Sequence, residues 1–152
     1  MNTLITPAEV LDSAFSPEEL YDVMVITPTD IATAEERYLI PIVGRELYDA
    51  LLAGEYESLR INYVLPAVAA WTRRIIEPLL ASRCGICHDH QPTAAEAEAL
   101  RERCRSLGLK ARTLSRRLAK QLNATADDYP EYDPMRNSLN RCSLDGDIVQ
   151  VR

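Results

Sequence analysis

The chain has 152 residues, and its 23 acidic and 17 basic side chains leave a formal net charge of −6. This length fits one domain, and a content of 47% hydrophobic and 26% charged residues is typical of a folded globular protein rather than a disordered or collagen-like one. The longest uncharged stretch of the apolar middle, residues 61–72, is shorter than the roughly 20 residues that span a membrane. We therefore expect no membrane-spanning helix and no membrane partner.

Charge is distributed unevenly along the chain. Residues 1–60 hold twelve acidic and three basic side chains, whereas residues 93–122 hold three acidic and eight basic ones. The basic segment either packs against the acidic N-terminal part of the same chain, or lies in solvent, or forms an interface with another subunit or with nucleic acid. The first basic residue is Arg37, so the basic start of a secretory signal is missing and we expect an intracellular protein.

Helix-start signals recur in the first half of the chain. Thr6-Pro7, Ser16-Pro17 and Thr27-Pro28 each precede an acidic residue, and Thr93 repeats the pattern without proline. With Gly44 and Gly54 as stops, the pattern predicts a helix over 7–14, at most a helical turn over 17–22, and helices over 28–40 and 45–53. The β-branched run 21–26 leaves a short extended segment open as an alternative.

Two long helices follow. The first, over 57–82, is apolar on almost every side, which predicts burial at the centre of a bundle. Pro66 and Pro78 should bend or interrupt it, because each lacks a backbone donor. Trp71, the only tryptophan, is expected to anchor the core.

The second long helix, over 93–122, is amphipathic and basic. Plotted at about 100° per residue, one stripe is apolar and another carries arginines on the opposite side. The apolar stripe comprises Leu100, Cys104, Leu107, Ala111, Leu114, Leu118 and Leu122. The basic stripe comprises Arg101, Arg105, Arg112, Arg116 and Lys120. Gly108 interrupts the pattern, and we expect a local irregularity there.

After residue 122 the chain turns polar. Tyr129 and Tyr132 flank a proline in an acidic loop, and could clamp this loop onto the body or contact a partner. Residues 145–151 resemble a turn leading into a short strand, which is marginal alone in water. We therefore expect an all-α fold, a small helical bundle over 1–132 built on the kinked central helix and the basic helix. An irregular tail over 133–152 would be a short strand or disordered.

One segment carries residues that could ligate a metal. Cys84, Cys87, His88 and His90 lie within seven positions, a spacing that suits zinc but also matches covalent haem attachment. A fourth zinc ligand is missing, since Cys104 lies on the apolar stripe and Cys142 would have to fold back. The alternative is a loop whose thiols stay reduced. We expect no cofactor, with zinc as the open alternative, and the absence of catalytic motifs indicates that the chain is not an enzyme.

Several phrases together resemble a known family. They are LITPAEV at 4–10, DIATAE at 30–35, LIPIVGRELY at 39–48, YVLPAVAAW at 63–71 and YPEY at 129–132. In this order they are similar to the helical head-tail connector, or adaptor, proteins of tailed bacteriophages and prophages. The likeness spans roughly residues 1–132, while the Cys/His segment and the tail depart from it.

The resemblance implies a structural protein that assembles as a ring, either alone or only on the portal, between the portal and the tail-completion proteins. DNA would pass through the ring without sequence-specific binding, in the bacterial cytoplasm during assembly and later in the virion neck. Such a ring needs two different complementary surfaces on each subunit. The candidate interface residues are Arg101, Arg105, Arg112, Arg116, Tyr129 and Tyr132. A small zinc-binding regulatory module and a nucleic-acid-binding helical module are the alternatives.

Overall fold

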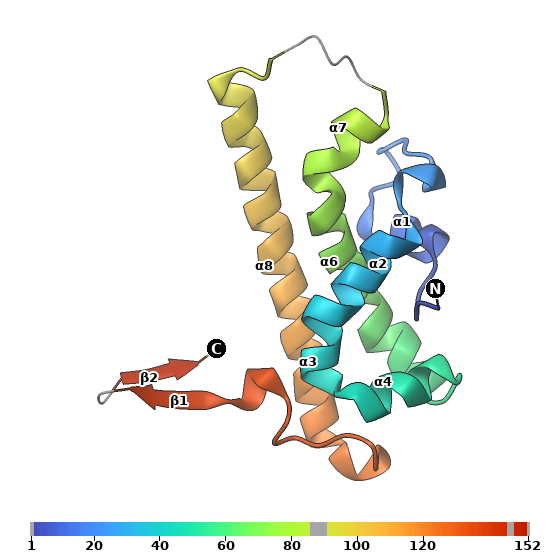
Figure 1. Ribbon diagram of the computed structural model, residues 1–152, viewed down its shortest axis with the longest axis vertical. Coiled ribbons are helices and arrows are strands. Elements are labelled where there is room, and N and C mark those ends of the chain that lie inside the picture. The colour runs from blue at the N-terminus through green and yellow to red at the C-terminus, as the bar shows by residue number, and fades with distance from the viewer. Residues whose placement is uncertain (1, 86–90, 146–147, 152) are drawn as a thin grey trace.

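The computed structural model describes residues 2–85, 91–145 and 148–151, with side chains up to Arg141. The fold is all-α, as the sequence predicts. Figure 1 shows a long helix lying beside a second helical column, with the remaining helices packed across that column. The α-helices are α1 Pro7–Ala14, α2 Pro28–Ala34, α3 Ile40–Val43, α4 Arg45–Leu52, α5 Glu57–Leu59, α6 Leu65–Ile76, α7 Leu80–Arg83 and α8 Ala94–Ala124.

The predicted helix starts are confirmed where threonine precedes the helix. Thr6, Thr27 and Thr93 each accept a hydrogen bond from the backbone of the third helical residue, whose carboxylate accepts one from the threonine N–H in return. Ser16 starts only a hydrogen-bonded turn, closed by the N–H of Glu19 on the Ser16 carbonyl at 2.9 Å. The extended alternative for residues 21–26 is wrong, because Val23–Val25 form a 3₁₀ turn, η1, capped by Asp22.

The helix predicted over 28–40 continues to Val43 through a π-helical turn, η2, over Glu35–Leu39. The N–H of Ile40 bonds to the Glu35 carbonyl, five residues back. This wider turn comes directly before Pro41, which has no N–H to donate and whose ring would crowd a regular turn. The run ends at Gly44, whose φ of +83° is easily adopted only by glycine.

The central helical run, Glu57–Arg83, has its irregularities at its prolines, as predicted. A second π-helical turn, η3 over Arg60–Val64, precedes Pro66. A 3₁₀ turn, η4 over Glu77–Leu79, contains Pro78. Between them lies α6, which packs against α1, α2 and α8 and carries the centre of the core.

The long helix α8 runs without interruption through Gly108, so the predicted irregularity at that residue is wrong. Its apolar stripe is deepest in the C-terminal half, where Ala111, Leu118 and Leu122 are buried. Leu100, Cys104 and Leu107 are only half-buried. The N-terminal part of α8 is therefore less covered than the rest, which leaves room for a groove beside it.

The C-terminal segment first packs on the body and then pairs with itself. Tyr132 and Asn137 are buried, and the Tyr132 hydroxyl donates to Asn123 at 2.6 Å. Beyond a 3₁₀ turn, η6 over Ser138–Asn140, the backbone forms an antiparallel pair of strands, β1 Cys142–Asp145 and β2 Ile148–Val151. The sequence suggested the second strand but not its pairing. Throughout the described ranges, no helix is both long enough and apolar enough to cross a membrane.

Glu35 is an acidic residue in the core. Only 1% of it is exposed, and it accepts hydrogen bonds from the Leu4 N–H at 2.7 Å and the Tyr48 hydroxyl at 2.8 Å. Burial raises the pKa of Glu35 above its usual value, although these hydrogen bonds lower it in part. Burial and the hydrogen bond to Glu35 likewise raise the pKa of Tyr48.

The Glu35→Gln variant should gain stability relative to the wild type as pH rises. Because the folded-state pKa is raised, the contribution of Glu35 is fully present below the unfolded pKa and is lost as pH increases through the folded pKa. The free energy of unfolding falls by about 1.4 kcal/mol for each unit by which folding raises the pKa of Glu35. Urea unfolding of both proteins at about pH 4 and about pH 7 measures the difference. A stability difference that is independent of pH would contradict this prediction.

Candidate interaction surface

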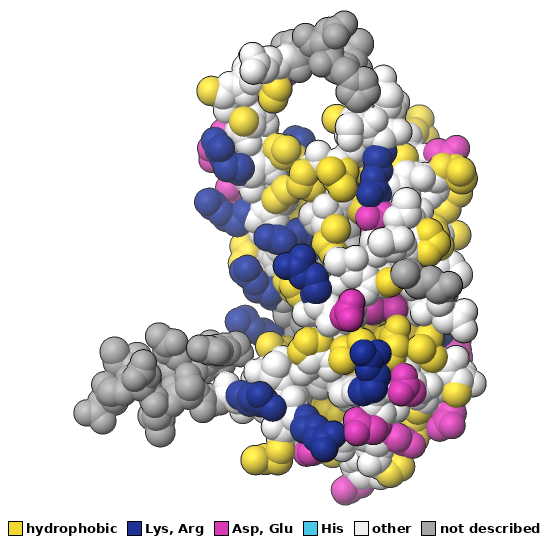
Figure 2. Space-filling view, in the orientation of Figure 1, with side chains coloured by type: hydrophobic (Ala, Val, Ile, Leu, Met, Phe, Trp, Pro, Cys, Tyr) yellow, Lys and Arg dark blue, Asp and Glu magenta, His cyan; other side chains and the backbone are white. Residues whose placement is uncertain are grey.

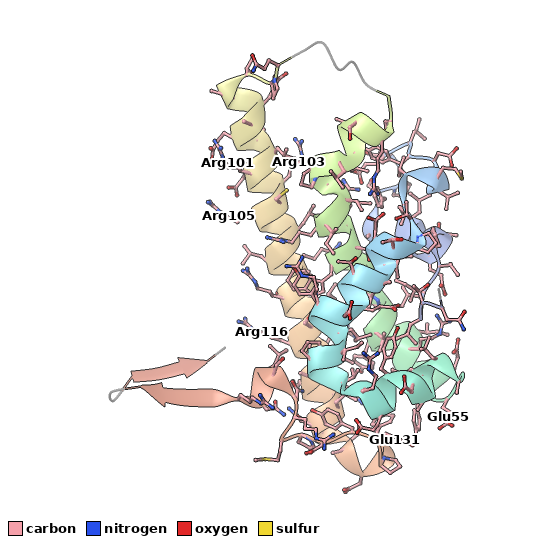
Figure 3. The ribbon with its side chains drawn as sticks, viewed as in Figure 1. Glu55, Arg101, Arg103, Arg105, Arg116 and Glu131 are labelled. Atoms are coloured by element: carbon pink, nitrogen blue, oxygen red, sulfur yellow. The ribbon has the colours of Figure 1, made fainter. Side chains whose placement is uncertain are left out.

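The predicted arginines form one exposed surface of α8. We call Arg101, Arg105, Arg112 and Arg116 the basic face, and all four are exposed. Figure 2 shows Lys and Arg side chains following this helix along one side of the molecule. In Figure 3, Arg101, Arg105 and Arg116 lie along the side of α8 that is free of α6.

The basic face is not neutralised by the acidic N-terminal part of the chain. Arg101 pairs with Glu98 at 2.7 Å and Arg105 with Glu102 at 3.2 Å, both within α8 and more than 60% exposed. Such pairs contribute little to stability in water. Among the ion pairs formed by the described residues, only Arg103 links α8 to another helix, through Glu77 at 3.2 Å. The surface is therefore available to an external anion.

A groove runs along the basic face, and we call it the arginine groove. It consists of two cavities, of about 410 and 490 Å³, that share Arg112. Among the described residues that line them, six are arginine and none is acidic. The arginines are Arg37, Arg74, Arg101, Arg105, Arg112 and Arg116. Guanidinium groups stay protonated and donate in a planar fork, so this groove can bind oxyanions.

Arg74 and Gly108 form the recess of the first cavity. A Cβ atom at Gly108 would lie 2.8 Å from the Arg74 Nε, so the absence of a side chain at Gly108 allows Arg74 to lie against α8. The Arg74 Nε is buried and has no hydrogen-bond partner among the described residues. Sequence reasoning missed Arg74, and Gly108 within a basic helix was the one signal that could have suggested a close approach there.

Aromatic rings form part of the floor of the second cavity. Tyr38 stacks on Trp71 with ring centroids 3.8 Å apart and planes only 2° from parallel. The Trp71 Nε1 donates to the Ser115 hydroxyl at 2.9 Å, which fixes α6 against α8. Trp71 is thus buried in the core as predicted, and it also lines the second cavity.

An acidic surface lies at another end of the molecule. We call Glu55, Asp127, Asp128 and Glu131 the acidic pole. The loop over 129–131 is tied to Tyr56, the residue before α5. Tyr129 packs edge-on against the Tyr56 ring at 5.0 Å, and the Tyr56 hydroxyl donates to Glu131 at 2.9 Å. The hydrogen bond to Glu131 raises the pKa of Tyr56. Glu55 and Glu131 lie beside the end of α4 in Figure 3, away from the labelled arginines.

The two predicted interface tyrosines differ in their surroundings. Tyr129 is half-buried against Tyr56 and borders the exposed Asp128. Tyr132 is buried in the core, and its hydroxyl also accepts from Asn137 at 2.8 Å. Tyr132 therefore anchors the loop on the body, whereas Tyr129 lies at the edge of the acidic pole.

The Cys/His segment lies mostly outside the described residues. Cys84 is exposed at the end of α7, whereas Cys87, His88 and His90 fall beyond the described ranges. Within those ranges, no group of three His, Cys, Asp or Glu side chains could hold a metal ion. Cys104 is half-buried and lines the first cavity of the arginine groove.

No protein-family model, curated protein or solved structure matches this chain. Among the described residues, the arginine groove has an excess of positive charge and the acidic pole an excess of negative charge.

Proposed function

We propose that this chain is a structural subunit of a phage or prophage head-tail connector and has no enzymatic role. The sequence phrases that resemble this family support the proposal, and the compact helical body is compatible with it. In this proposal the subunits assemble as a ring, alone or on the portal, in the bacterial cytoplasm and remain in the virion neck. The portal and tail-completion proteins are its partners, and DNA passes through the lumen.

One observation carries the proposal. Each subunit of a cyclic ring must present two different surfaces, one of which fits the other on the next copy. This chain presents an arginine-lined surface along α8 and an acidic pole at the far end of the helical body. Opposite charges on separate surfaces favour head-to-tail contacts and disfavour contacts between two identical surfaces.

The test is a deletion of the gene in the phage or prophage that encodes this chain. We expect electron micrographs of the lysate to contain heads and tails that are not joined, and infectious particles to be lost. A plasmid copy of the wild-type gene is the control and should restore joined particles, in which mass spectrometry detects the chain. Normal infectious particles from the deletion strain would overturn the proposal.

A further inference from the structure

The arginine groove requires a ligand of negative charge. Its six arginines line two cavities without a carboxylate among the described lining residues, although the protein as a whole is acidic. Arginines that line one cavity repel one another, so an anion that enters the cavity is attracted by the guanidinium groups around it, although Arg101 and Arg105 also pair with exposed carboxylates of α8. The Arg74 Nε is already buried and finds no partner in the described part of the chain, so the cost of removing it from water is incurred before the anion arrives.

The apolar residues that line the arginine groove restrict the class of ligand that it can bind. Alongside the arginines, the first cavity is lined by Pro78, Leu100 and Cys104, and the second by Tyr38, Pro41, Ile42, Trp71 and Leu139. Inorganic phosphate or a DNA backbone would satisfy the guanidinium groups but leave this apolar floor uncovered. A protein segment that carries carboxylates next to aromatic or aliphatic side chains fits both parts.

The chain itself contains a surface of this composition. Asp127 and Asp128 are exposed, and no ion pair within the described part of the chain involves them. They precede Tyr129 and the exposed Pro130, so carboxylates, an aromatic ring and an apolar ring are contiguous. Glu131 and Glu55 add negative charge around Tyr56, against which Tyr129 packs.

We infer that the arginine groove of one copy binds the acidic pole of the next copy. This inference rests on the proposed function, because it names the subunit contact of the ring. The two surfaces belong to different parts of the body (Figure 3), so the contact is heterologous and each copy can use both surfaces at once. Arg112, which is shared by the two cavities, lies at the centre of the binding surface.

Charge reversal in the full-length chain tests the contact. The Arg112→Glu and Asp128→Arg variants should each associate about tenfold more weakly than the wild type, or worse, in sedimentation velocity at low salt. An equimolar mixture of the two should recover association. The altered groove of the first variant then meets the altered acidic pole of the second, which carries the opposite charge, and the two unaltered surfaces meet as in the wild type. Added salt should weaken the wild-type complex.

Two further variants separate the groove from general charge effects. Lys110→Glu makes the same charge change on an exposed residue of α8 that does not line the groove, and should associate like the wild type. Gly108→Ala keeps the charge, but its Cβ must displace Arg74 from the recess. It should fold normally by circular dichroism and associate more weakly.

The inference is overturned if the wild type stays monomeric at the highest soluble concentration. It is also overturned if Lys110→Glu weakens association as much as Arg112→Glu does, or if the mixture of Arg112→Glu and Asp128→Arg fails to recover association. The groove would instead be assigned to nucleic acid if the wild type bound an oligonucleotide, Arg112→Glu did not, and the mixture of variants failed to recover self-association. None of these outcomes affects the gene-deletion test, so a wrong subunit contact is distinguishable from a wrong function.

Discussion

Replacing Trp71 with alanine is expected to lower the free energy of unfolding by about 3–5 kcal/mol. Only 7% of this residue is exposed, and it joins three parts of the fold. Its ring stacks on Tyr38 of η2, its backbone belongs to α6, and its Nε1 donates to Ser115 of α8. Removing it leaves a cavity at this junction and takes the partner from the buried Ser115 hydroxyl.

Urea unfolding followed by circular dichroism measures this loss without relying on tryptophan fluorescence. Trp71→Phe should cost less than the alanine variant, because a ring remains to stack on Tyr38 while the hydrogen bond is lost. Leu109→Ala on the same helix as Ser115 is the matched control, since Leu109 is 56% exposed. It should change stability by no more than about 0.5 kcal/mol. Equal losses for Trp71→Ala and Leu109→Ala would refute the central position of Trp71.

The helices could be predicted because their signals are local. A threonine followed three residues later by Glu or Asp fixes a helix start through its own hydrogen bonds, and this held at Thr6, Thr27 and Thr93. The effect of proline could be predicted only in part. Pro66 and Pro78 mark irregular turns as expected, but Pro41 is accommodated within a helical run by the π-helical turn before it.

The candidate surface could be predicted as a stripe but not as a groove. Helical spacing places Arg101, Arg105 and Arg116 on one side of α8, and that side is exposed. The recess depends on Arg74, which comes from α6 and meets Gly108 across the packed helices. Such a contact is set by tertiary packing between segments far apart in the chain, so neither periodicity nor composition could reveal it.

The same limit applies to charge pairing. Segment charges suggested that α8 could pack against the acidic N-terminal part, but acidic residues of that part pair with arginines outside α8. Glu9 pairs with Arg60, Glu19 with Arg73 and Asp30 with Arg83. Counting charges by segment cannot tell which side chains meet. Among the described residues, the ion pairs of α8 are formed with Glu98, Glu102 and Glu77, and not with the carboxylates of residues 1–60.

Arg73 is the most deeply buried of these arginines and should be among the most costly to remove. Its Nε lies 2.7 Å from Glu77 and its Nη2 2.9 Å from Glu19, while its guanidinium packs 3.8 Å from the centre of the Phe15 ring. The Glu77 side chain is only 6% exposed. In Arg73→Ala, the one ion-pair partner that remains for that buried carboxylate among the described residues is Arg103, at 3.2 Å.

We therefore expect Arg73→Ala to destabilise the protein by about 3–5 kcal/mol in urea unfolding. Most of this loss should come from the stranded Glu77 rather than from a lost attraction, because burying two charges already costs nearly as much as their pairing returns. The double variant Arg73→Met with Glu77→Leu should then recover to within about 1 kcal/mol of the wild type. Arg101→Ala, which breaks an exposed pair on α8, should cost less than about 1 kcal/mol. A double variant as unstable as Arg73→Ala would mean that the contacts of Arg73 itself, its pair with Glu19 included, account for the loss, and not the poorly paired carboxylate of Glu77.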